Sequence, residues 1–176
     1  MKKILVHTLV IIAFFIIYIL QANFFNWFNI YGVKPNLFVV LVIFIGLFMG
    51  KIEAAVYGTL IGLLYVLLIG KNTSANAVIL GLLGYAVGTY RNSFSKENRL
   101  NIMIIIASGT IIYEISIYIL KIIFSGVSIQ ILEFLKILSI EILFNTILTI
   151  ILYPIVLALG EKTDKVIHAK KAMRYY

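Results

Sequence analysis

Long apolar segments, separated by short polar breaks, dominate this chain. A helix of about 20 apolar residues crosses the hydrocarbon core of a bilayer, which is about 30 Å thick. Of the 176 residues, 62% are apolar or aromatic and 12% are charged, so a soluble domain of this length could not shield them all from water. The pattern predicts an all-α polytopic integral membrane protein, a six-helix transmembrane bundle that forms a single domain over residues 1–176. The predicted spans are Ile4–Leu20, Leu37–Met49, Ala54–Ile69, Ala75–Tyr90, Asn101–Phe124 and Ile137–Leu159.

Two of these segments have competing interpretations. The first follows Lys2 and Lys3 like a signal peptide, but its apolar run is too long and no small-residue cleavage pattern follows, so we expect a retained span. The second, Leu37–Met49, covers only about 20 Å as a helix. We expect it to span with Lys34 and Lys51 snorkelling at its ends, and a re-entrant segment is the alternative.

The basic residues predict the orientation and the environment. The net charge is +8, and the lysines and arginines lie in loops and tails, which favours contact with anionic lipid over nucleic acid. With both termini in the cytoplasm, eleven basic residues lie inside: Lys2, Lys3, Lys51, Arg91, Lys96, Arg99, Lys162, Lys165, Lys170, Lys171 and Arg174. Four lie outside: Lys34, Lys71, Lys121 and Lys136. Since cytoplasmic loops are enriched in positive charge, we expect both termini to be cytoplasmic.

Small residues recur at helical spacing in the second, third and fourth segments. They form the pairs Gly46 and Gly50, Gly58 and Gly62, and Gly84 and Gly88. In lipid, such pairs let helix backbones approach closely and gain van der Waals contact. The pairs predict either close packing inside one bundle, which we favour, or a face on which a partner's transmembrane helix docks.

Polar side chains follow one face of each of the last two segments. Glu114, Tyr118 and Lys121 are spaced by four and three residues, and Glu141 and Asn145 by four. An ionised carboxylate in lipid is costly, so both acids should point inward. We expect either a network that holds the two helices together, which we favour, or a polar pocket open to the outer side, with Lys121 placed to pair with Glu141.

Other features complete the prediction. Pro154 predicts a kink near Ile150, because proline removes a donor and crowds the carbonyl four residues back.

Five aromatic residues between Gln21 and Asn36 suggest a loop at the outer interface, as an aromatic belt or, less favoured, a surface for a partner. The sequence has no cysteine and no catalytic or metal-binding signature, so we expect no enzyme, cofactor or metal. His7 and His168 have no ligand-spaced partner.

Several short motifs resemble the rod shape-determining protein MreD family. They are Gln21 after the first segment, Ile30-Tyr31-Gly32-Val33-Lys34-Pro35-Asn36-Leu37 before the second, the glycines from Gly46 to Gly62, and Asn145 with Pro154. The similarity covers nearly the whole chain. Tyr65 departs from the pattern, because many members have an acidic residue after the Gly62-Leu63-Leu64 step, and the resemblance therefore implies no role of that acid for this chain.

The resemblance implies a non-catalytic scaffold of cell elongation in the bacterial inner membrane. Its implied partners are an MreC-like bitopic protein, an MreB-like filament and cell-wall synthases, besides membrane lipids. The family's architecture is also similar to the S-components of energy-coupling-factor transporters, so a vitamin-binding subunit is the alternative. S-components usually carry an Ala-x-x-x-Ala motif on the first helix. Here that helix has Ala13 alone, which disfavours this alternative.

Overall fold

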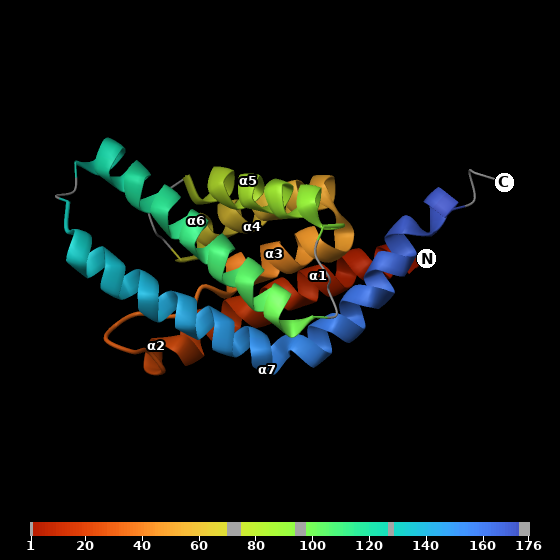
Figure 1. Ribbon diagram of the computed structural model, residues 1–176, viewed down its shortest axis with the longest axis horizontal. Coiled ribbons are helices and arrows are strands. Elements are labelled where there is room, and N and C mark those ends of the chain that lie inside the picture. Colours follow the sequence, from red (N-terminus) through yellow and green to blue (C-terminus); the bar gives the residue numbers. More distant parts are fainter. Residues whose placement is uncertain (1, 70–74, 94–97, 127–128, 173–176) are drawn as a thin grey trace.

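The computed structural model describes residues 2–69, 75–93, 98–126 and 129–172. This part of the chain is a bundle of helices, and every predicted apolar segment is helical in it (Figure 1). Four helical stretches are long and apolar enough to cross a membrane: Lys3–Trp27, Lys51–Leu68, Arg99–Phe124 and Ile131–Ile167. Two shorter apolar helices, Leu37–Met49 and Ala75–Tyr90, pack among them. The predicted all-α membrane bundle is confirmed.

The first helix runs further than the sequence predicts. Helix α1 (Lys2–Ile19) continues through a π-helical turn, η1 (Leu20–Phe24), into the short helix α2 (Phe25–Trp27). The chain then reverses at Tyr31 and Gly32, whose φ angles are 50° and 78°. Ile30 and Val33 exchange backbone hydrogen bonds of 3.1 and 2.9 Å across this turn. Two consecutive positive φ angles define the tight hairpin turn that favours glycine at its second position.

The short helix α3 (Leu37–Met49) lies in the core of the bundle. The Asn36 side chain caps its first turn by accepting a hydrogen bond of 3.4 Å from the Val39 amide. Every residue of α3 except Leu41 is buried, and the helix packs against α1, α4, α5, α6 and α7. Because protein covers α3 on all sides, its length does not have to match the hydrocarbon thickness. Lys34, expected to snorkel, donates a hydrogen bond to the Asn26 side chain.

Helices α4 (Lys51–Ile69) and α5 (Ala75–Tyr90) form the closest pair in the bundle. Only Gly50 separates α3 from α4, and its φ of 108° lets the chain change direction within one residue. Both helices also pack on α3. The three helices together form a compact block beside the longer α6 and α7 (Figure 1).

The last two helices are the longest. Helix α6 (Arg99–Ser125) starts at the Asn98 cap and ends at Gly126, which has a left-handed φ of 57°. Helix α7 (Ile131–Ala172) begins before the predicted span and continues beyond it, because the flanking Glu, Lys and Thr residues do not interrupt a helix although they lower the hydropathy. Pro154 lies inside α7, and the ribbon changes direction partway along the helix (Figure 1).

Candidate functional site

A polar cavity of about 710 Å³ lies at the end of the bundle where α1 gives way to the loop. Residues from η1, α2, the loop, α4, α6 and α7 meet around it. Its polar lining consists of Gln21, Asn26, Tyr31, Lys34, Asn36, Tyr65, Glu114, Lys121 and Glu141. Its volume is in the range of small-molecule sites in proteins.

Hydrogen bonds within the loop hold one wall of this cavity in place. The Gln21 side chain donates to the Pro35 carbonyl at 3.0 Å, which ties the end of α1 to the start of α3. The Lys34 ammonium donates to Asn26, whose own amide donates to the Ala22 carbonyl. These hydrogen bonds join the two ends of the loop, so they fix the position of this wall of the cavity.

Another part of the lining carries three of the residues that the sequence singles out. Glu114 and Lys121 come from α6 and Glu141 from α7. Glu141 is buried, Glu114 is half-buried and Lys121 is exposed, so the two acids lie deeper than the lysine. Tyr65 of α4 lies within electrostatic reach of both carboxylates. The cavity thus combines a buried and a half-buried carboxylate with an exposed lysine.

Tyr118, predicted to belong to the same group, lines a smaller adjoining cavity of about 210 Å³. Its ring stacks on Phe134 with centroids 4.2 Å apart, and its hydroxyl accepts a hydrogen bond of 2.9 Å from the Gln130 amide. Glu114 and Lys121 line both cavities. Tyr118 therefore joins the ends of α6 and α7 beside the larger cavity.

Asn145 lies outside both cavities, in a buried network that joins three helices. Its side-chain oxygen accepts a hydrogen bond of 2.8 Å from the Asn36 amide, at the start of α3. Its side-chain nitrogen donates to the Thr110 hydroxyl of α6 at 3.0 Å. The side chains of Asn145 and Thr110 are fully buried, so these bonds are made in a dry environment where they fix register.

The sequence predicts a polar pocket with three of the cavity's polar residues, Glu114, Lys121 and Glu141, and it does not identify the others as part of that pocket. In the sequence, Gln21 and Asn36 are notable only because they match motifs of the MreD family, and Tyr65 only because it departs from one. Nothing in the sequence singles out Asn26. These residues come from a turn, a loop and a different helix, so no helical spacing links them to Glu114 or Glu141. The polar residues on either side of the Tyr31–Gly32 turn were the available signal.

The glycine pairs meet other helices of the same chain. A Cβ atom at Gly58 would lie 2.8 Å from the Leu80 carbonyl carbon, and one at Gly84 would lie 2.8 Å from the Ala54 carbonyl carbon. A Cβ atom at Gly88 would lie 2.7 Å from the carbonyl carbon of Gly50. Gly46 and Gly62 also contact other helices of the chain, at Val87 and Ala77. Gly50 is the residue at which α3 ends and the chain turns. This geometry supports packing within the bundle.

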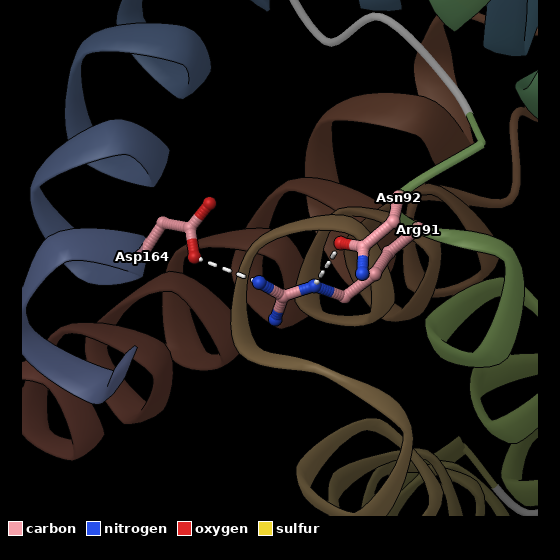
Figure 2. A network of polar contacts seen from close by, with 3 residues as sticks. All are labelled: Arg91, Asn92 and Asp164. Carbon is pink, nitrogen blue, oxygen red and sulfur yellow. Dashed lines mark hydrogen bonds and ion pairs between the residues drawn. The ribbon is translucent and has the colours of Figure 1, made fainter. Parts of the chain in front are cut away.

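The opposite end of the bundle carries two links between distant segments. His7 of α1 lies 2.6 Å from the Tyr57 hydroxyl of α4. Arg91, after α5, forms an ion pair of 3.0 Å with Asp164 near the end of α7, and its Nε donates to Asn92 at 3.3 Å (Figure 2). The first residues of α1 and the last turns of α7 lie at this same end (Figure 1). The side chain of His168 lies outside the described residues.

The apolar helical bundle, with four helices long and apolar enough to cross a membrane, defines a helical membrane protein. Its sequence matches the family model of the rod shape-determining protein MreD over residues 1–163. The chain therefore belongs to the MreD family, and its role lies in determining rod shape, as the motifs around Gln21 and Asn36 suggest. No curated protein and no solved structure matches the chain.

Proposed function

We propose that this chain is a non-catalytic scaffold of the cell-elongation machinery in the bacterial inner membrane. It acts in the regulation of cell shape and peptidoglycan synthesis by holding an MreC-like bitopic protein through helix–helix contacts. Through this partner it connects an MreB-like filament with the cell-wall synthases. The observation that carries the proposal is the family match over residues 1–163. In this proposal the bundle crosses the membrane six times, with both termini in the cytoplasm.

The packing of the bundle indicates where such a partner can bind. The chain's own helices occupy the glycine faces, so a partner's helix needs an outward-facing surface. Helix α1 offers one, because Ile12, Phe15 and Ile16 are half exposed and the helix packs only lightly on the rest of the bundle. We place the partner's transmembrane helix on this face of α1.

Site-specific photo-crosslinking in native membranes tests this proposal. A crosslinking residue at Ile12 or Phe15 should capture a bitopic coiled-coil protein. The matched control is a crosslinker at Val78 on α5, which is also exposed but lies on another helix. Equal capture from both sites would contradict binding of the partner on this face of α1. Failure of any bitopic protein to co-purify would contradict the scaffold role.

The cavity supports a second candidate function, that of a small-molecule-binding component of an energy-coupling-factor transporter. A polar cavity of about 710 Å³ between helices is large enough for a vitamin. Purification from the native membrane separates the two candidates. A vitamin and an ATPase module in the purified complex would favour the transporter, and a bitopic protein would favour the scaffold.

A further inference from the structure

The cavity beside the loop has its charges arranged by depth. Four of its polar side chains are buried: Glu141 is 6% exposed, Asn36 and Tyr65 are each 8% exposed, and Gln21 is 9% exposed. Glu114 and Lys34 are half-buried, and Lys121 is exposed. The deep part therefore carries the carboxylate of Glu141 and the amide of Gln21, and Lys121 is the most exposed of the charged side chains that line the cavity.

The deep part is a site for hydrogen-bond donors. Carboxylates of Glu114 and Glu141 offer several lone pairs each. The side-chain oxygen of Gln21 is buried, and it has no hydrogen-bond partner among the described residues, while the nitrogen of the same amide donates to Pro35. A buried acceptor without a donor is costly, so a donor at this position would stabilise the folded chain. An ammonium group supplies three donors and a charge that complements the two acids.

The opening of the cavity suits an anion. Lys121 of α6 and Lys34 of the loop both line the cavity, and Lys121 is exposed. A ligand whose ammonium group enters the deep part would place its other end near these two lysines. A phosphate or carboxylate there makes charge-assisted hydrogen bonds to an ammonium group. The charge arrangement thus matches a small zwitterion.

We infer that this cavity binds a primary amine joined by a short linker to a phosphate or carboxylate. The ammonium group lies against Glu114, Glu141 and Gln21, and the anionic group lies against Lys34 and Lys121. Two sources carry this chemistry: the headgroup of an aminophospholipid in the adjacent leaflet, and a free zwitterion in solution. The inference concerns the cavity alone and does not depend on the scaffold role.

Two binding measurements on the full chain separate these sources. Calorimetry on the detergent-purified protein measures the affinity for O-phosphoethanolamine, with inorganic phosphate and ethylene glycol as comparison probes. Native mass spectrometry after release from nanodiscs measures whether phosphatidylethanolamine is retained in preference to phosphatidylglycerol. Binding of the free zwitterion alone, of the lipid alone or of both supports the inference and identifies the source. Failure of both, or equal binding of the comparison probes, would overturn it.

Variants test the position of each charge. Glu141→Gln should weaken binding about tenfold or more, because a charge-assisted hydrogen bond is lost. Glu161→Gln, on the same helix but outside the cavity, should bind like the unmodified chain. Lys121→Gln changes an exposed side chain and should leave folding intact. It should weaken binding of O-phosphoethanolamine but not of ethanolamine. If Glu141→Gln does not fold, Lys121→Gln decides, and unchanged binding of O-phosphoethanolamine by that variant would overturn the inference.

Discussion

Replacing Gly62 with leucine tests how tightly α4 and α5 pack. A Cβ atom at Gly62 would lie 2.7 Å from both the Ala77 amide nitrogen and the Asn76 carbonyl oxygen. These are backbone atoms, so no side chain can rotate away and the two helices must separate. Overpacking typically costs 1–3 kcal/mol, and a rigid backbone contact places this variant at about 3 kcal/mol. For a chain of this length, that loss lowers Tm by about 6–12 °C.

Thermal unfolding of the detergent-purified variants measures this effect. Gly62→Ala adds only the Cβ atom and should fall between the unmodified chain and Gly62→Leu. Val56→Leu enlarges an exposed residue on the same helix and should leave Tm within about 2 °C, as surface changes usually do. A folded Gly62→Leu protein with unchanged Tm would refute the packing argument. If that protein also lost its bitopic partner, Gly62 would belong to a docking face.

Four further outcomes are expected from other parts of the chain. Asn145→Leu removes the acceptor of the Asn36 amide and the donor to Thr110, and should cost about 2–3 kcal/mol in thermal or denaturant unfolding. Arg91→Ala and Asp164→Ala should show a coupling energy of about 0.5–1 kcal/mol in a double-mutant cycle, and additive effects would deny the pair a role in stability. Reporter domains fused after Tyr176 or inserted in the loop after Arg91 should both read cytoplasmic, and an external signal from either would break the six-span topology. Replacing the five basic residues between Lys162 and Arg174 with glutamine should weaken binding of a tail peptide to anionic vesicles, by about 1 kcal/mol per residue at most, and equal binding to neutral vesicles would contradict a role in lipid contact.

Hydropathy predicts the helices of this chain but not where they end. The apolar core of α7 is visible in the sequence, whereas the helix continues through Glu161, Lys162 and Thr163. These residues lower hydropathy without breaking a helix. Where a capping residue or a glycine marks the end of a helix, as at Asn36 and Gly50, the predicted bounds of α3 match the structure.

The small size of α3 shows what a single sequence cannot resolve. Its residues are uniformly apolar, which fits a lipid-exposed helix and a buried one equally well. The structure surrounds it with five other helices, and this arrangement depends on pairings between distant segments. Likewise, the spacing of Gly58 and Gly62 predicts close packing, but only the fold identifies Leu80 and Ala77 as their neighbours.

The cavity was predictable only where helical spacing connects its residues. Glu114 and Lys121 lie seven residues apart on one face of α6, and this spacing predicts a shared polar surface. Asn26 and Lys34 reach the same cavity from a loop whose path depends on the Tyr31–Gly32 turn. Loop paths follow from individual hydrogen bonds, which periodicity does not encode.

The bend in α7 divides the helix into a longer part in the bundle and a shorter C-terminal arm. Beyond Pro154, residues 155–172 extend about 27 Å as a helix, so a rotation of about 10° at the bend moves the far end by about 5 Å. The ion pair between Arg91 and Asp164 joins this arm to the segment after α5, and Gly160 of the arm packs against the Phe48 ring of α3. Spin-label distances from the arm to α5 would report any rotation when that ion pair is removed. A small rearrangement around Pro154 would thus be amplified into a larger displacement at the end of the arm.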